Sequence, residues 1–196
     1  MDIWNIIYIF VGVLNNIKLY KTMKLELKNV KINESFSEET TMFKADLFVN
    51  GVKVAYANND GRGGCTFYSY YEGKEVLLVK AEEYANGLPS KFYDFGLGEH
   101  EIKSSLQGWI DNTIHNICKE KDKLKAEKKI LKACDTAIVW GNPNKNNYKQ
   151  WGFKEKINLS LLYNTPSGKD SINKLVSKVK AELQADEIIF NKNIPI

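Results

Sequence analysis

The sequence predicts an α+β fold, with an N-terminal antiparallel β-meander, central helices that include one long helix, and a C-terminal β-hairpin followed by a helix and a terminal strand. Residues 43–58 alternate between apolar and polar side chains around an Asn-Gly pair, which is typical of a β-hairpin. Apolar residues recur at helical spacing over residues 104–134. Strands come first and helices later, without regular strand–helix alternation, and this order indicates α+β rather than α/β.

The composition is that of an ordinary globular chain with a mild excess of positive charge. The chain has 196 residues, of which 43% are hydrophobic, and a formal net charge of +4. A chain of this length usually forms one domain, so we predict a single α+β domain over residues 23–196. The charge permits an anionic partner without requiring one, because dedicated nucleic-acid-binding domains usually have a pI above about 9.

The first 22 residues differ from the rest of the chain. Residues 3–14 form an apolar run of 12 residues, whereas a membrane-spanning helix needs about 20. Only Asp2 precedes the run, so the basic start of a secretory signal is missing. Three interpretations stay open: an upstream in-frame extension with Met23 as the natural start, a segment packed on the domain, or a peripheral membrane anchor. We expect the first, and no membrane span.

Four strands are predicted to form the meander. Residues 24–32 make the first, and its apolar residues change phase at Asn29, which predicts a bulge or a strand end there. The hairpin over residues 43–58 supplies the next two strands. Residues 65–71 are expected to add the fourth.

Asn50-Gly51 is predicted to form a type I′ turn, because both central residues of that turn need positive φ. Folding about it places six residues on the core face as three cross-strand pairs: Val49 with Val52, Leu47 with Val54, and Ala45 with Tyr56. The opposite face is expected to carry Lys44, Asp46, Phe48 and Lys53.

Helical periodicity predicts helices over residues 75–89, 104–134 and 169–183, with residues between the first two forming turns. Leu124 and Leu131 are expected to continue the buried stripe of the long helix. Short apolar runs predict strands at residues 136–141, 157–163 and 186–191, the first two joined as the C-terminal hairpin.

The stretch NNDGRGGC is the least ordinary in the chain. Its residues are the main candidates for ligand binding: Asn59, Asp60, Gly61, Arg62, Gly63, Gly64 and Cys65. A dinucleotide fingerprint fails here, because Thr66 stands where a third glycine is needed and a strand follows. Backbone amides of a glycine loop can converge on an anion, and Arg62 would add further donors. The alternative is a tight turn in which glycine supplies positive φ.

Aromatic residues beside basic ones suggest stacking surfaces. Tyr68 and Tyr70 follow the glycine loop and share one face of their strand, opposite to Phe67. Exposed rings of this kind can stack nucleic-acid bases. A secondary basic and aromatic patch is formed by Lys145, Tyr148, Lys149 and Trp151. The alternative is that these rings fill the core.

Cys65 is a weak candidate nucleophile. A catalytic cysteine needs a nearby base, and His100 with Asp94 could supply the base and its orienting group. His115 falls beside the apolar stripe of the long helix and is expected to be structural. The wide spacing of the three cysteines indicates reduced thiols rather than a disulfide framework or a metal site.

The stretch SGKDS follows a predicted strand and opens a helix. The Walker form fails, because Tyr163 replaces its first glycine and Asp170 its serine or threonine. We expect a helix start instead, with Ser167 or Asp170 as the N-cap.

Three motifs within residues 23–73 carry a family resemblance: KLELKNVKIN, FKADLFVNG and NDGRGGCT. In these motifs the chain resembles a group of small uncharacterised proteins encoded by bacteriophages and prophages. The resemblance implies a small phage accessory protein that acts in the cytoplasm of a bacterial host, and it supports Met23 as the natural start. The group has no assigned activity, so it transfers no catalytic or binding residue.

The sequence therefore predicts a non-enzymatic binding module with a host-interaction or anti-defence role. Its partner would be an anionic ligand, either a nucleotide or a nucleic acid, or a host protein. Two alternatives stay open: a small nucleotide- or acyl-directed transferase or hydrolase that uses Cys65, and a virion-associated structural protein. No cofactor or metal is expected, because the sequence has no metal-ligand spacing.

Overall fold

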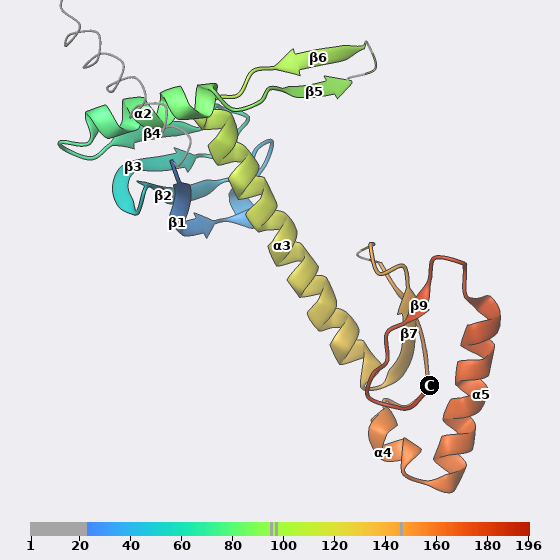
Figure 1. The fold of residues 1–196 in the computed structure, drawn as a ribbon. Helices are drawn as coiled ribbons and strands as arrows, with labels where there is room; N and C mark the ends of the chain where they lie inside the picture. The colour runs from blue at the N-terminus through green and yellow to red at the C-terminus, as the bar shows by residue number, and fades with distance from the viewer. Residues whose placement is uncertain (1–22, 95, 97, 146) are drawn as a thin grey trace, which may run out of the picture. The chain divides into compact units, whose positions relative to one another are not determined.

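The computed structural model describes residues 23–94, 96, 98–145 and 147–196 (Figure 1). The three interpretations of residues 1–22 concern residues outside this set. The chain divides into two compact units, one ending at Ile117 and the other covering Cys118–Ile196. The boundary falls within the long helix α3 (Leu106–Cys134), and each unit is described by itself. No helix in the described part of the chain has the length and apolar character needed to cross a membrane.

The first unit is built on a four-stranded antiparallel sheet whose strands follow one another in chain order. The strands are β1 (Leu25–Ile32), β2 (Phe43–Val49), β3 (Val52–Asn59) and β4 (Phe67–Tyr70), with a short 3-10 helix η1 (Glu34–Phe36) between the first two. Asn50 and Gly51 both have positive φ, 50° and 81°. The predicted meander and its Asn-Gly turn are therefore confirmed.

Two irregularities set which side chains face the core. The predicted bulge in β1 is confirmed, because Asn29 has a φ of 52° and the register shifts between Lys28 and Lys31. A second shift lies in the β2–β3 hairpin, where Leu47 pairs with Ala55 rather than with Val54.

The predicted pair of Val49 with Val52 is confirmed, but from Val54 onward the predicted register is wrong by one residue. Val54 is the extra residue of a β-bulge, and both it and Ala55 are buried. Tyr56 consequently pairs with Asp46, on the face opposite to the one predicted, while Ala57 takes the place facing Ala45. Val52, also expected in the core, is exposed at the end of the hairpin.

The core of this unit lies between one face of the sheet and two helices. The sheet contributes Phe43, Ala45, Leu47, Val49, Ala55 and Ala57, all buried. Helix α2 (Glu75–Asn86) contacts β3 and buries Leu78, Ala81 and Ala85. Because several of these side chains are alanines, the helix packs close to the strands. The part of α3 within this unit buries Leu106, Ile110 and Ile114, as its periodicity predicted.

The passage between α2 and α3 contains a hairpin that the sequence did not predict. Strands β5 (Lys91–Asp94) and β6 (Glu99–Ile102) form a separate two-stranded sheet (Figure 1). All eight of their residues are exposed. Strand prediction relies on a buried face with period two, and this hairpin has none.

The second unit contains a three-stranded sheet with order β8-β7-β9. Its elements are β7 (Ala137–Gly141), β8 (Lys149–Gly152), α4 (Leu159–Tyr163), α5 (Pro166–Glu182) and β9 (Ile188–Ile189). The buried face of α5, with Ile172, Val176 and Val179, packs in one cluster with Ile138 and Trp140 of β7. The terminal strand and the amphipathic helix are thus confirmed.

Three predictions for this unit are wrong: the strand over residues 157–163, its pairing in the C-terminal hairpin, and the burial of Leu124 and Leu131. Residues 157–163 are mostly helix α4 rather than a strand, because the Asn158 side chain accepts a hydrogen bond from the Leu161 amide at 3.1 Å and caps the turn. The C-terminal hairpin exists, but β8 is the partner of β7. Leu124 and Leu131 do not extend the buried stripe, since they are 54% and 62% exposed.

The glycine of the SGKDS stretch serves helix packing. Thr165, rather than Ser167 or Asp170, is the N-cap of α5, because its hydroxyl accepts a hydrogen bond from the Gly168 amide at 3.2 Å. A β-carbon at Gly168 would collide with the Leu162 carbonyl oxygen. Glycine is therefore required for the close contact of α4 with α5.

Candidate functional site

The face of the four-stranded sheet opposite to α2 and α3, here called the outer face, gathers most of the charged and aromatic side chains of the sheet. The cross-strand register and the alternation along each strand place these residues on it: Lys24, Glu26, Lys28, Lys31, Lys44, Asp46, Phe48, Lys53, Tyr56 and Phe67. Five lysines stand against two carboxylates. The face is therefore more strongly basic than the chain as a whole.

Asp46 is the buried anchor of this face. Its carboxylate accepts hydrogen bonds from Asn29 Nδ2 and the Tyr71 hydroxyl, each at 2.7 Å, and pairs with Lys53 Nζ at 3.0 Å. Burial by itself would raise the pKa of Asp46, but the hydrogen bonds from Asn29, Tyr71 and Lys53 outweigh it and lower the pKa. Asp46 thus stays ionised and holds the Lys53 ammonium 4.6 Å from the centre of the Tyr71 ring.

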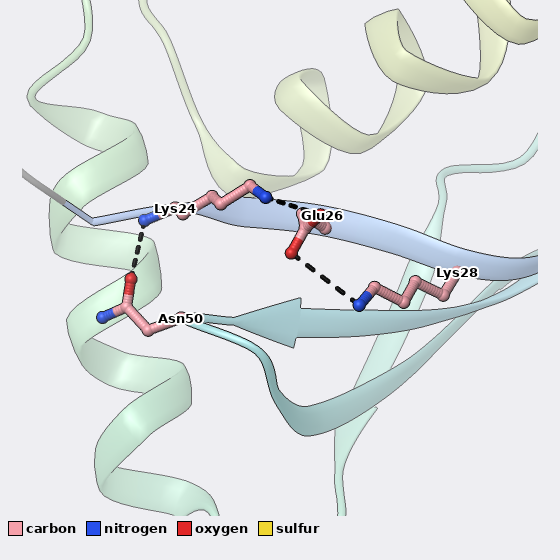
Figure 2. Close-up of polar contacts among 4 residues, drawn as sticks. All are labelled: Lys24, Glu26, Lys28 and Asn50. Carbon is pink, nitrogen blue, oxygen red and sulfur yellow. Dashed lines mark hydrogen bonds and ion pairs between the residues drawn. The ribbon is translucent and has the colours of Figure 1, made fainter.

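Glu26 organises the edge of the face along β1 (Figure 2). Its carboxylate lies 2.9 Å from Lys24 Nζ and 3.9 Å from Lys28 Nζ. The hydrogen bond from Lys24 is the main reason that the pKa of Glu26 is lowered. Lys28 in turn lies over the Phe48 ring, 4.6 Å from its centre. The Lys24 amide donates to Asn50 Oδ1 at 2.8 Å, which ties the start of β1 to the hairpin turn.

Lys31 and Lys44 face each other directly across β1 and β2. Neither ammonium forms an ion pair with a carboxylate among the described residues. Together with Asn33 and Met42 they line a hollow of about 300 Å³. Like charges directly opposite each other destabilise a sheet, so an anion bound between these ammonium groups would relieve their repulsion.

Aromatic rings complete the outer face. Phe67 on the edge strand β4 is 68% exposed, and Tyr56 on β3 is half-buried. Phe67 pairs with Asn58 and Tyr56 pairs with Ser69, so the two rings are diagonal neighbours. Diagonal neighbours in a sheet are about 7–8 Å apart. We call these two rings, which lie on the face that carries the lysines, the aromatic strip.

Tyr68 and Tyr70, which were predicted to be the stacking rings, both lie on the core face, opposite Ala57 and Ala55. The Tyr68 hydroxyl donates a hydrogen bond to Glu82 Oε1 at 2.9 Å. Burial and this carboxylate raise the pKa of Tyr68 to about 12. Tyr70 is 52% exposed at the edge of the sheet. The ring that points outward from β4 is Phe67.

The loop from Asn59 to Cys65 is held by hydrogen bonds to its own side chains and to Thr40. Asn59 Oδ1 accepts hydrogen bonds from the Gly61 amide and from Thr40 Oγ1, both at 2.8 Å. The Arg62 amide donates to Asp60 Oδ1 at 3.2 Å, and the Gly63 amide donates to Thr40 Oγ1 at 3.3 Å.

These three consecutive amides are the groups that an anion nest would use. Because they already have partners, the geometry favours the turn over the nest. Ligand binding by residues 59–65 stays a prediction, and the exposed Arg62 side chain is its best remaining element.

Cys65 opens onto a cavity of about 510 Å³ between this loop and α3. The cavity is also lined by Asp111 and His115, while His100 and Asp94 are not among its lining residues. The predicted pairing of Cys65 with His100 therefore has no support from this cavity, and His115, expected to be structural, is exposed. The sequence feature that could have indicated this role for His115 is its position four residues after Asp111, which places both side chains on one helix face.

The same cavity is acidic, because Glu38, Glu39 and Asp111 line it. Asp111 Oδ1 accepts a hydrogen bond from Thr66 Oγ1 at 2.5 Å. In the described part of the chain, no three His, Cys, Asp or Glu side chains are arranged to hold a metal ion. The acidic lining of the cavity does not suit an anion.

The secondary patch is only partly assembled and is neutralised by acids. Lys145, Tyr148 and Lys149 line a hollow of about 330 Å³ in the second unit, together with Asp186 and Glu187. Lys149 Nζ lies 2.9 Å from Glu187 Oε1. Trp151 packs edge-on against Trp140, with ring centres 5.9 Å apart, and belongs to the core. This patch offers less free positive charge than the outer face.

Comparison with protein-family models, curated proteins and solved structures finds no match to this chain. The resemblance to phage-encoded proteins therefore stays an expectation. On the outer face, positive charge, the exposed Phe67 ring and two unpaired ammonium groups coincide.

Proposed function

We propose that this chain is a non-enzymatic binding protein whose outer face captures a phosphate-bearing polyanion. The observation that carries the proposal is the direct opposition of Lys31 and Lys44, which form no ion pair with a described carboxylate. Two adjacent ammonium groups without matching carboxylates attract a polyanion and gain from charge complementarity on binding.

The two carboxylates on this face neutralise part of its positive charge, but they also hold three of its lysines in place. Asp46 fixes Lys53, and Glu26 holds Lys24 and Lys28 on one side of β1. Lysine side chains lose considerable conformational entropy when a ligand orders them. Lysines that are already ordered bind at a smaller entropic cost.

The setting is the bacterial cytoplasm, where a small phage accessory protein of the kind implied by the sequence resemblance would meet nucleic acids and other phosphorylated partners. A nucleotide, a nucleic acid or the phosphorylated surface of a host component would all present phosphate groups to the outer face. The proposal concerns this shared phosphate chemistry.

Heparin chromatography with a double variant tests the proposal. Lys31→Ala/Lys44→Ala should elute from heparin at clearly lower salt than the parent chain, because it loses two ammonium groups from one surface. Lys174→Ala/Lys178→Ala on the exposed side of α5 is the matched control, since it removes the same charge from the second unit. Equal shifts for the two double variants would contradict the proposal.

A second candidate function is a thiol-dependent enzyme at Cys65. The observation that favours it is that Cys65, Asp111 and His115 line one cavity. A histidine close enough to act as a base would speed the reaction of the thiol. This candidate expects Cys65 to react with iodoacetamide faster than free cysteine at pH 7, and expects His115→Ala to slow the reaction. A rate equal to that of free cysteine would exclude it.

A further inference from the structure

We infer that the polyanion is single-stranded nucleic acid, with its bases stacked on the aromatic strip of the outer face and its phosphates held by the surrounding lysines. This inference rests on the proposed function and narrows it to one class of ligand. The observation that favours nucleic acid over other polyanions is the exposed Phe67 ring. It lies next to Tyr56, on the same face as the five lysines.

The aromatic strip and the lysines around it supply the two features used by proteins that bind single-stranded nucleic acid without sequence preference. Such proteins track the backbone with positive charge and stack successive bases on aromatic rings. Phe67 is 68% exposed on the edge strand of the sheet. An exposed phenylalanine has no polar atom through which water could satisfy it, so a flat apolar base is a fitting cover for it.

Two lysines already lie against rings of this face. Lys28 is 4.6 Å from the centre of the Phe48 ring, and Lys53 is 4.6 Å from the centre of the Tyr71 ring. These contacts keep two ammonium groups beside rings of the outer face, where the backbone of a bound nucleic acid would need positive charge.

The geometry favours a single strand over a duplex. In a duplex the bases are stacked on each other, and only their edges are accessible in the grooves. A ring on an open sheet face can cover a base only when that base is unstacked. DNA and RNA single strands share the chemistry used here, because the contacts involve base faces and phosphates.

Fluorescence anisotropy with labelled oligonucleotides tests the inference. The full chain is titrated into a 15-nucleotide oligo-dT, a 15-nucleotide oligo-U and a mixed-sequence 15-base-pair DNA duplex, each at several salt concentrations. We expect tighter binding to the single strands than to the duplex. The comparison of oligo-dT with oligo-U shows whether DNA or RNA is preferred.

Two variants distinguish the contribution of base stacking to the affinity from that of phosphate contacts. Phe67→Ala should weaken single-strand binding by about 5- to 100-fold, the usual effect of losing one stacked base, with the salt dependence unchanged. For Lys31→Ala/Lys44→Ala, the plot of the logarithm of the association constant against the logarithm of the salt concentration should become less steep. The magnitude of its negative slope should fall by about 1.4, because two phosphate contacts are lost. Phe92→Ala is the matched control, since Phe92 is 62% exposed but lies on the separate β5–β6 sheet.

The outcomes distinguish the inference from the function on which it rests. Equal affinity for single strands and duplex, with no effect of Phe67→Ala but a loss in the lysine double variant, would overturn the inference and leave polyanion binding intact. Equal losses for Phe67→Ala and Phe92→Ala would also overturn it. Absence of binding to every oligonucleotide and to heparin would overturn both.

Discussion

The Tyr71 hydroxyl donates a hydrogen bond to Asp46 Oδ1 at 2.7 Å, linking residues that are 25 positions apart. Tyr71 comes directly after the edge strand β4, while Asp46 lies on β2, so the bond reaches across β3 on the outer face. Asp46 also accepts a hydrogen bond from the side chain of Asn29, which lies at the bulge of β1. One buried carboxylate thus ties three segments together beneath the lysines.

Replacing this carboxylate should destabilise the first unit. Asp46→Asn removes the charge that Asn29, Tyr71 and Lys53 share, and we expect a loss of about 2 kcal/mol in the free energy of unfolding, because hydrogen bonds to charged groups contribute about 1.5–3 kcal/mol. Urea denaturation measures the loss. Asp122→Asn is the control, since its carboxylate is exposed on α3 and surface ion pairs contribute little.

The effect of Asp46→Asn should depend on pH. A carboxylate whose pKa is lowered in the folded state stabilises the protein above its ordinary pKa, and this contribution is lost as pH falls through the folded value. The stability difference between the two chains should therefore be constant near neutral pH and shrink below about pH 4. A difference that stays unchanged at low pH would contradict the assigned role.

Tyr68 should produce a loss of stability at alkaline pH. Its pKa rises from 10.0 to about 12 on folding, so the folded state keeps a proton that the unfolded state has already released. The contribution is complete below pH 10 and disappears as pH rises from about 10 to about 12. Urea denaturation over this range should show a steeper decline for the parent chain than for Tyr68→Phe. Parallel declines would show that Tyr68 titrates normally.

Gly61 should not tolerate a side chain, while Gly64 should. Gly61 has a φ of 86°, and a β-carbon there would collide with the Phe36 carbonyl oxygen. We expect Gly61→Ala to cost about 2 kcal/mol, from left-handed strain and the clash together. A β-carbon at Gly64 would meet only Asp60 Oδ1 at 3.9 Å, so Gly64→Ala should change stability by less than about 0.5 kcal/mol. Thermal unfolding of both variants measures the contrast, and equal losses would show that the loop is not the turn described here.

The cysteines should differ in reactivity toward iodoacetamide. Cys134 is buried, and burial followed by the nearby Asp135 carboxylate raises its pKa to about 11. It should remain unmodified in the folded chain at pH 8, while the exposed Cys65 reacts first. Peptide mapping by mass spectrometry locates the label, with the urea-unfolded chain as the control in which all thiols react. Labelling of Cys134 as fast as Cys65 in the folded chain would contradict its burial.

Local patterns in the sequence determined the elements that carry their own signals. The Asn50-Gly51 turn depends on two adjacent residues that adopt positive φ, and the helices depend on apolar spacing along a single segment. The change of phase in the apolar alternation at Asn29 likewise predicted the bulge in β1. The α+β class followed from the order of these elements. No comparable signal marked β5 and β6, whose residues are all exposed.

Only the tertiary structure decided which residues share a surface. The bulge at Val54 moved Tyr56 to the outer face, because one extra residue reverses the direction of every later side chain in a strand. Lys31 and Lys44 are separated by η1 and a loop, so their opposition depends on strand pairing. Asp46, expected on the exposed face, is buried because Asn29, Lys53 and Tyr71 close around it. Elements can be predicted from neighbours in the chain, whereas the outer face arises from neighbours across the sheet.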